Sequence, residues 1–468
     1  MGRQGWDMAA SDGRTLYSAE QGSFSIALVG DVMLNRRISL HDEPGFLKLR
    51  AILQGADAAF ANLETTVRND DEGTPTRSYA TYTTMPPAML DELKWLGINL
   101  LSAANNHAYD YNEGGVLATI THLQRAGLVF AGLGRNLTKA RAPGYLDTRN
   151  GRVGLVAATT TFYPWSRAGE ARPDVQGRAG INPIGFKIEY QVEPRHLAAL
   201  REISTALGFA RESARKRKHF YSDKEAGGGA DDTVHLLGAN FTAGDRPMFT
   251  GHADPADLAG NMKWIREARR QSDWVVASIH SHDFAFSSVS TANRQSEMTD
   301  PIECVREFAH RAVDEGADLV VGHGSHTVLG IEIYKGRPIL YGVGNFFFQN
   351  ETIEAFPADS YERFELTSEA TPADFLDART DKDRKGHPSD PLFWEGVAAV
   401  CDFEGRKLKR VVFHPVDSGF GRPRAQRGRP VLATGATAQK ILERIETLSK
   451  PFGTVVKRAG DTAVVEIE

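Results

Sequence analysis

The sequence predicts an α/β protein, because short continuous apolar runs alternate with amphipathic stretches along most of the chain. Continuous apolarity, without the polar alternation of a half-exposed strand, is typical of strands buried on both faces. Helical stretches between such strands indicate a layered α/β fold. The runs occupy 24–30, 58–64, 98–105, 153–159, 274–280, 318–324 and 338–345.

Three helices are predicted between these strands from their first and last residues. They span 86–97, 112–127 and 300–316. Each begins at Pro or a polar capping residue and ends at Gly, which is the usual asymmetry of helix termini.

The pattern changes towards the end of the chain. Residues 396–416 predict a hairpin, because two strand-like runs meet at a Glu-Gly turn with no helix between them. Two regions, about 163–255 and 350–392, interrupt the alternation and are interpreted as insertions that could cover a cleft. We therefore expect one domain over 24–420, with 421–468 as a helix and strand extension packed on it.

Composition limits the class of protein. The chain has 468 residues, 41% hydrophobic and 25% charged, with a net charge of -5, and its charges of both signs are interspersed. No sustained basic field is present, so we expect neither a nucleic-acid partner nor a membrane partner. Residues 1–25 lack the apolar segment of a signal peptide and no run is long enough to span a membrane, so we expect a cytoplasmic protein. The oligomeric state stays open.

The two cysteines, Cys304 and Cys401, lie far apart in the sequence. This separation excludes a disulfide framework and a cysteine-rich zinc site. Any bound metal must therefore be held by His, Asn and carboxylate groups.

Residues of these types follow five of the predicted strands. In open α/β sheets the carboxyl ends of the strands form one edge, so such residues can converge although they are far apart in sequence. A single Asp there is commonly a turn or a cap, and a single His is commonly a hydrogen-bonded neighbour, but their joint occurrence favours a metal centre. The residues are Asp31, Glu64, Asn105 to His107, His280 to Asp283, and His323 with His326.

Four motifs carry a family resemblance: "GDVML", "ANLETTV", "SAANNHAYDYNEGG" and "GHGSHTVLGIEIYKGRPILYGVGNF". Their order resembles the calcineurin-like metallophosphatase superfamily and, more closely, the bacterial capsule-synthesis family associated with poly-γ-glutamate (CapA-like). The resemblance runs from about Ile26 to Pro415 and leaves both insertions unmatched. It implies a four-layer α-β-β-α sandwich with one or two divalent ions (Mn, Zn or Fe) at the strand ends.

The resemblance also implies roles for individual residues. The implied metal ligands are Asp31, Glu64, Asn106, His280, His323 and His326. His107 corresponds to the residue that assists the leaving group. Asp110, three residues later, either orients His107 or caps the helix that follows.

Two departures from the phosphatase pattern are visible. Met33 stands where phosphatases have a His, so one metal would lose a ligand unless another residue, such as His282, replaces it. The spacing between His323 and His326 is one residue longer than in the phosphatase motif.

Further residues are candidates for substrate contact. A guanidinium binds carboxylate or phosphate bidentately, so Arg36 and Arg37 could reach an anionic substrate from their place after Asp31, or could be ordinary surface residues. The other candidates are His282, Asp283 and Asn345.

The favoured function is a metal-dependent hydrolase that cleaves an amide or γ-glutamyl-type bond of a small or oligomeric anionic substrate by metal-activated water. The amide preference follows from the family name. The alternatives are a phosphoesterase, a non-hydrolytic subunit of capsule polymer synthesis or export, and a metal-stabilised binding module without turnover.

Overall fold

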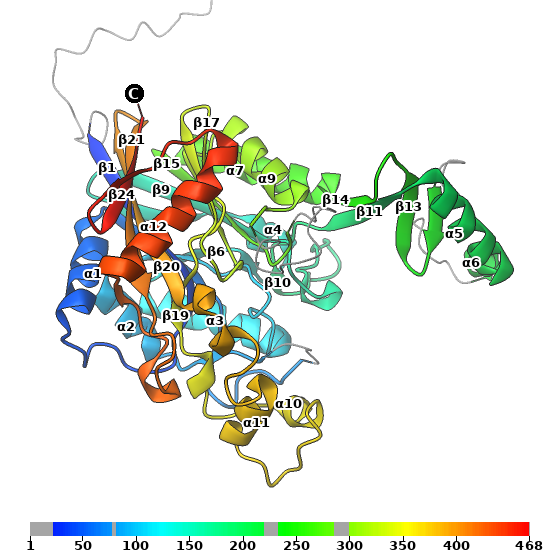
Figure 1. Cartoon of the computed structure of the whole chain (residues 1–468), viewed down its shortest axis with the longest axis horizontal. Coiled ribbons are helices and arrows are strands. Elements are labelled where there is room, and N and C mark those ends of the chain that lie inside the picture. The colour runs from blue at the N-terminus through cyan, green and yellow to red at the C-terminus, as the bar shows by residue number, and fades with distance from the viewer. Residues whose placement is uncertain (1–21, 77–80, 220–232, 285–298, 468) are drawn as a thin grey trace, which may run out of the picture.

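The protein is described here by a computed structural model that covers residues 22–76, 81–219, 233–284 and 299–467. Two large β-sheets form its body (Figure 1). The strands of the larger sheet are β1 (Ser23–Met33), β2 (Ala58–Leu63), β5 (Leu100–Ser102), β6 (Val129–Ala131), β19 (Asn345–Phe348), β20 (Glu395–Glu404), β21 (Lys407–Asp417), β22 (Val431–Leu432), β23 (Lys457–Ala459) and β24 (Thr462–Glu466). Their order is β23-β24-β21-β20-β1-β2-β5-β6, with β19 beside β1 and β22 beside β21.

The smaller sheet has six strands in the order β17-β18-β16-β15-β9-β8. These are β8 (Gly144–Thr148), β9 (Gly151–Thr159), β15 (Trp274–His280), β16 (Leu319–His323), β17 (Ile331–Tyr334) and β18 (Arg337–Leu340). The inner faces of the two sheets share one apolar core, in which Phe24 of β1 stacks on Trp274 of β15 with 4.8 Å between ring centroids.

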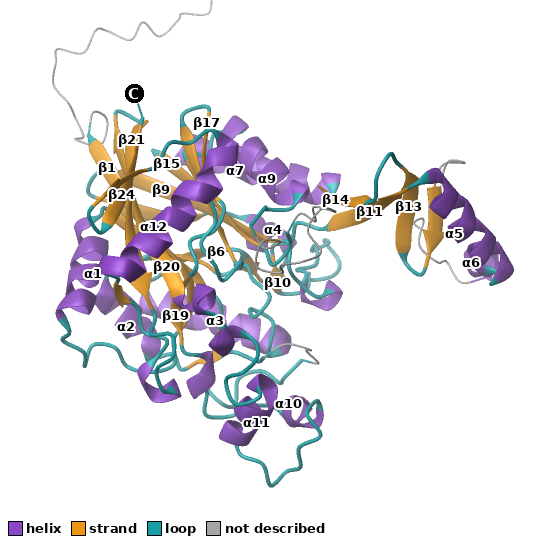
Figure 2. Ribbon diagram, in the orientation of Figure 1, coloured by secondary structure: helices purple, strands orange, loops and turns teal. Residues whose placement is uncertain are grey.

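Helices cover the outer faces of both sheets (Figure 2). Helices α1 (Pro44–Gly55) and α2 (Met89–Leu96) pack on the larger sheet, and α7 (Pro255–Gln271) and α9 (Glu303–Asp314) pack on the smaller one. The remaining helices of the body are α3 (Asn112–Ala126), α4 (Leu137–Arg141) and α12 (Gly435–Ser449). The predicted mixed α/β class is confirmed.

Most predicted elements occur near their expected places. Helices α2 and α3 end at Gly97 and Gly127, and both glycines have the left-handed backbone that glycine adopts without strain. The predicted hairpin is formed by β20 and β21, which pair antiparallel.

The single strand predicted over 338–345 is wrong. Strand β18 ends at Leu340 in the smaller sheet, and β19 begins at Asn345 in the larger sheet. Gly344, between them, has φ 75°. A left-handed residue cannot continue a strand, so the chain crosses here from one sheet to the other.

The first insertion, 163–255, contains a separate sheet in the order β12-β13-β11-β14. With two helices it projects from the body as an arm (Figure 1). Its elements are η2 (Pro164–Ser166), β10 (Gly180–Ile181), β11 (Phe186–Val192), α5 (Pro194–Ala206), α6 (Phe209–His219), β12 (Thr233–Leu236), β13 (Ala239–Ala243) and β14 (Met248–Ala253). β10 pairs with β7 (Leu133–Gly134) in the body.

The second insertion, 350–392, is built from short helices. They are η3 (Asn350–Thr352), α10 (Ala358–Glu362), α11 (Pro372–Thr380), η4 (His387–Ser389) and η5 (Pro391–Trp394). The remaining elements are β3 (Thr66–Val67), β4 (Thr84–Met85), η6 (Arg424–Gln426) and η7 (Lys450–Phe452).

The C-terminal residues are integrated into the body. β24 pairs antiparallel with β21, and α12 contributes Ile441 and Leu442 to the core between the sheets. In the described ranges, no helix has both the length and the apolar character that a membrane span requires.

Candidate metal centre

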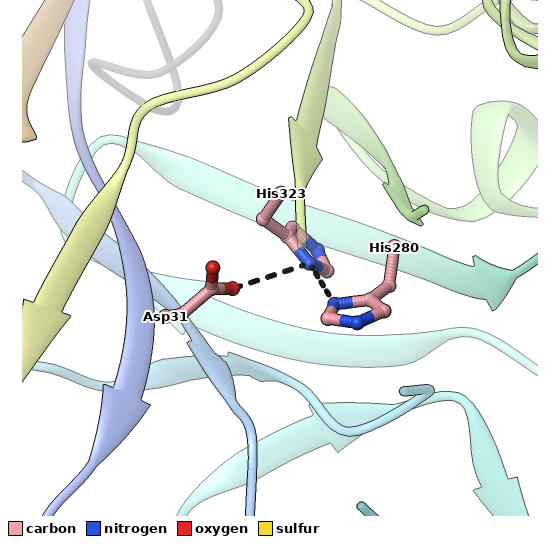
Figure 3. A group of neighbouring side chains, drawn as sticks. All are labelled: Asp31, His280 and His323. Carbon is pink, nitrogen blue, oxygen red and sulfur yellow. Dashed lines mark hydrogen bonds and ion pairs between the residues drawn. The ribbon is translucent and has the colours of Figure 1, made fainter. Parts of the chain in front are cut away.

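Three strand ends from the two sheets bring metal-ligand side chains together (Figure 3). Asp31 lies near the end of β1, His280 ends β15 and His323 ends β16. Parallel pairing of β15 with β16 sets His280 directly opposite His323, and their Nδ1 atoms are 3.0 Å apart. Asp31 Oδ1 lies 3.8 Å from His323 Nδ1. All three side chains are buried.

A second set of ligand-type groups surrounds Glu64, which directly follows β2. The Nε2 atoms of His280, His282 and His326 each lie 3.7 Å from Glu64 Oε1. His326 Nδ1 lies 3.3 Å from Asp31 Oδ2 and so connects the two sets. These six residues form three overlapping groups in which one ligand atom per residue lies within 4.8 Å of the others. We call Asp31, Glu64, His280, His282, His323 and His326 the metal-type group.

Glu64 provides the test of whether a metal fits. Its side chain is fully buried, and among the described residues neither carboxylate oxygen has a hydrogen-bond partner. Burial, together with the nearby Asp31 carboxylate, raises the pKa of Glu64 well above its usual range. A buried carboxylate that nothing satisfies is costly, and a cation held among these groups removes that cost. The residues present therefore fit a divalent ion, and imidazole with carboxylate suits Zn²⁺, Mn²⁺ or Fe²⁺.

Three of the histidines, His280, His282 and His323, are held in the neutral form that coordinates metals. Burial, reinforced by neighbouring histidines, lowers the pKa of His280 well below its ordinary value and that of His282 to about 3. Burial lowers the pKa of His323 to about 4, against the opposing effect of Asp31. Burial alone would raise the pKa of Asp31, but the hydrogen bond and charge of His326 lower it. His280, His282 and His323 thus offer neutral imidazole nitrogens beside the ionised Asp31 carboxylate.

Neighbouring polar groups orient these side chains. Asn62 Nδ2 donates to Asp31 Oδ1 at 2.8 Å, and Ser278 Oγ lies 2.6 Å from His323 Nε2. Asn345 Oδ1 lies 2.9 Å from His326 Nδ1, so Asn345 orients a member of the metal-type group. Its predicted contact with substrate stays a prediction. Such contacts fix the tautomer and direction of a ligand.

Asn106, the remaining predicted ligand, is half-buried at the edge of the group. Its Oδ1 lies 2.9 Å from His280 Nε2.

His107 and Asp110 form a buried pair beside the metal-type group. His107 Nδ1 lies 2.7 Å from Asp110 Oδ2, which also accepts the backbone N–H of Thr83 at 2.7 Å. Burial raises the pKa of Asp110, with His107 acting in the opposite direction. Asp110 gives no side-chain cap to α3, so of the two predicted roles the geometry shows the contact with His107.

Arg36 and Arg37 are not brought to the group. The Arg36 guanidinium donates to the carbonyls of Ala425 and Arg427, at 2.6 and 3.0 Å, and Arg37 Nε lies 3.4 Å from Glu92 Oε1. Their predicted role with substrate stays a prediction, and it requires each side chain to leave its present partners.

Asp283, a further substrate candidate, is also engaged elsewhere. It accepts the hydroxyls of Thr160 and Thr161 at 3.1 and 3.3 Å. Burial raises its pKa.

Met33 lies outside the metal-type group. It is buried with Phe348 and Trp394 in a small apolar cluster, so the position where phosphatases have a His is part of the core here. His282, in contrast, lies within the group and is available as the replacement ligand.

The sequence analysis missed two kinds of neighbour. Asn62 belongs to the same motif as Glu64, ANLETTV, but was given no role, although its place at a strand end was a signal. His387 comes from the second insertion, for which no motif existed, and its ring centroid lies 5.3 Å from that of His326.

Comparison with known proteins identifies the family. Residues 25–350 match the family model described as "Bacterial capsule synthesis protein PGA_cap". The chain is 32% identical to the uncharacterized protein y4sH of Sinorhizobium fredii, over 92% of this chain and 90% of that protein. It is 28% identical to a probable polyglutamine synthesis accessory protein of Mycobacterium tuberculosis, over 62% of this chain and 55% of that protein. It is 24% identical to the PGA biosynthesis protein CapA of Bacillus subtilis, over 69% and 63%.

The resemblance carried by the four motifs is thereby confirmed, since the matched residues contain all of them and nearly the whole chain aligns with one relative. The chain belongs to the bacterial capsule synthesis protein family PGA_cap.

Proposed function

We propose that this chain is a metal-dependent hydrolase that cleaves an amide or γ-glutamyl-type bond in a small or oligomeric anionic substrate. The observation that carries the proposal is the unsatisfied Glu64 carboxylate, which faces three histidines beside the buried His107–Asp110 pair. A purely structural core would not be expected to retain such a carboxylate without a cation.

The residues of the metal-type group would hold the ion, with Asn106 at their edge. A divalent ion bound there supplies a Lewis acid and a water of lowered pKa. The chain's own residues do the rest: Asp110 holds the Nδ1 side of His107, which leaves Nε2 free to carry a proton to the leaving group.

The amide class is supported by the names of two relatives, which refer to PGA biosynthesis and to polyglutamine synthesis. The phosphoesterase alternative is supported by the motif order shared with metallophosphatases. Met33 in an apolar cluster weighs against an unmodified phosphatase centre. The word "accessory" in a relative's name keeps a non-hydrolytic subunit as the third possibility.

The fold that the resemblance implies is consistent with this function. Helices α1 and α2 outside one sheet, and α7 and α9 outside the other, support the four-layer α-β-β-α arrangement.

The test combines metal analysis with turnover. We expect roughly one tightly bound Mn, Zn or Fe ion per chain, and chelator-sensitive hydrolysis of γ-glutamyl dipeptides or oligomers, with p-nitrophenyl phosphate as the phosphoester comparison. His107→Asn should retain metal and thermal stability while losing about a hundredfold or more in kcat, the scale of a lost general acid.

Three other outcomes would each favour a different role for the chain or for His107. Turnover of the phosphoester alone would favour the phosphoesterase. Full metal content without any turnover would favour the accessory subunit. Unfolding of His107→Asn would show that this residue is structural.

A further inference from the structure

A small pocket in the second insertion borders the metal-type group. Its volume is about 80 Å³, and its lining includes Asn350, Glu351, Arg379 and His387. His387 also packs its ring edge-on against the ring of His326, with 5.3 Å between centroids. The pocket and the metal-type group therefore share the imidazole of His387 as a wall.

The acidic residue of this pocket is already neutralised. Both carboxylate oxygens of Glu351 are bound by Arg427, at 2.5 Å from Nε and 2.7 Å from Nη2, and both side chains are buried. A bidentate pair of this kind satisfies a carboxylate. Glu351 is therefore already paired and does not bind the arginine that lines the pocket, Arg379.

Arg379 lies in the last turn of α11. Across the described ranges of the chain, no hydrogen bond or ion pair joins its guanidinium to another group. Burial lowers the pKa of the Arg379 guanidinium, and nearby Arg363 adds to this effect while Glu351 opposes it. A half-buried guanidinium that no described group binds can bind an anion that comes from outside.

A second polar group in the pocket is also unused. Asn350 is buried, and its Oδ1 has no hydrogen-bond partner among the described residues. A half-turn of this amide would present its NH₂ to the same space. An unsatisfied buried amide beside a guanidinium that no described group binds indicates room for a ligand.

The size of the pocket limits that ligand. A water molecule takes about 30 Å³, so a volume of about 80 Å³ holds a group of the size of a carboxylate or a phosphate. The pocket therefore takes one anionic group while the rest of the molecule lies outside it.

We propose that Arg379, assisted by Asn350, binds a carboxylate of the substrate and so positions the neighbouring bond at the metal-type group. This inference rests on the proposed function, because it assigns the substrate's anionic group to a place beside the proposed centre. It gives the second insertion a role in specificity, and it moves the anion-binding role from Arg36 and Arg37 to a residue whose guanidinium is free.

The test measures binding by calorimetry on the full chain loaded with metal. The probes are γ-L-glutamyl-L-glutamate, the same dipeptide with its carboxylates converted to amides, and inorganic phosphate. The variants are Arg379→Met, Arg379→Lys and the control Arg384→Met, which removes an exposed arginine of the same insertion paired with Asp381.

We expect Arg379→Met to weaken binding of the dipeptide about tenfold or more, because a charge-assisted hydrogen bond to its carboxylate is lost. Arg379→Lys should lie between wild type and Arg379→Met, since lysine keeps the charge but not the fork. Arg384→Met should match wild type. The amidated dipeptide should bind weakly and equally to wild type and to Arg379→Met. Metal content and thermal unfolding should be the same in all variants.

Equal binding of the dipeptide to wild type and Arg379→Met would overturn the proposal, as would an Arg379 effect on the amidated probe as large as on the dipeptide. Arg379-dependent binding of phosphate without the dipeptide would overturn the carboxylate assignment in favour of a phosphoryl group. Arg379-dependent dipeptide binding without turnover would uphold the pocket and reject the hydrolase. Turnover with an unchanged KM in Arg379→Met would support the hydrolase and reject the pocket as the site that binds the substrate's carboxylate.

Discussion

Two buried glutamates of this chain have opposite surroundings. Glu92 accepts the backbone N–H groups of Ile38 and Ser39, at 3.0 and 2.7 Å, and the hydroxyl of Ser39 at 3.0 Å. Glu64 has no hydrogen bond among the described residues. The first carboxylate stabilises the fold, whereas the second has no structural partner to lose.

This contrast leads to a prediction. Glu64→Gln should leave the free energy of unfolding of the metal-free protein unchanged or raise it, because no hydrogen bond is lost and a buried acidic group with a raised pKa is removed. It should also lose most of the bound metal, since an amide oxygen carries no charge. Glu92→Gln is the matched control and should lower the free energy of unfolding by about 1–3 kcal/mol with metal content unchanged.

Denaturant titration and elemental analysis of both variants provide the measurement. If metal-free Glu64→Gln is as destabilised as Glu92→Gln, the Glu64 carboxylate supports the fold directly. The argument for a cation would then fail.

At this scale the sequence anticipated much of the site. Strand ends of an α/β protein meet at one edge, so Asp31, Glu64, His280 and His323 could be grouped without coordinates. The partners of Arg36 could not be anticipated, because the carbonyls that bind its guanidinium belong to Ala425 and Arg427, far away in the sequence. Arg379 and His387 were missed for a similar reason, since the second insertion had no motif to align.

At the scale of elements, the approach of β1 to the crossing between β18 and β19 positions Asp31. Gly30 lies so close to this crossing that an added Cβ would be 1.7 Å from the carbonyl oxygen of Gly344. Asp31 N donates to the same oxygen at 3.3 Å. The sequence predicted one strand over 338–345 and not this crossing. An apolar run does not indicate that its two halves pair in different sheets.

Gly30→Ala should therefore force β1 away from the crossing. We expect the free energy of unfolding to fall by at least about 1–3 kcal/mol, the usual cost of overpacking. Metal content should fall as well, because Asp31 is the next residue. Circular dichroism under denaturant and elemental analysis measure the two effects.

Gly55→Ala is the control for this substitution. Gly55 ends α1, and a Cβ there meets nothing within 4 Å. Alanine should leave stability unchanged or raise it by up to about 1 kcal/mol. Equal stability of the two variants would mean that β1 moves without cost and that the close approach does not position Asp31.

At the scale of the whole molecule, the two insertions have different relations to the metal-type group. The second reaches it through His387. The first forms its own sheet and its own apolar cluster, around Leu197, Val234 and Leu236. Both insertions were interpreted from the sequence as possible covers of a cleft. Composition shows where an insertion interrupts the α/β pattern, but not towards which part of the molecule it folds.

The arm should be removable without loss of the metal centre. Its entry strand β11 and exit strand β14 pair antiparallel from Phe186 opposite Ala253 to Gln191 opposite Met248. Replacing residues 192–247 with Asn-Gly would close these strands with a two-residue turn suited to a hairpin. The replacement keeps Phe186 and Phe249, which pack against the core of the smaller sheet. We expect metal content within error of wild type and a Tm changed by only a few degrees, because the described residues of the removed segment form a cluster of their own. Elemental analysis and calorimetry check this, with γ-L-glutamyl-L-glutamate binding as a third readout.

Loss of metal would show that the arm supports the centre, whereas retained metal with lost dipeptide binding would show that the arm contacts the substrate.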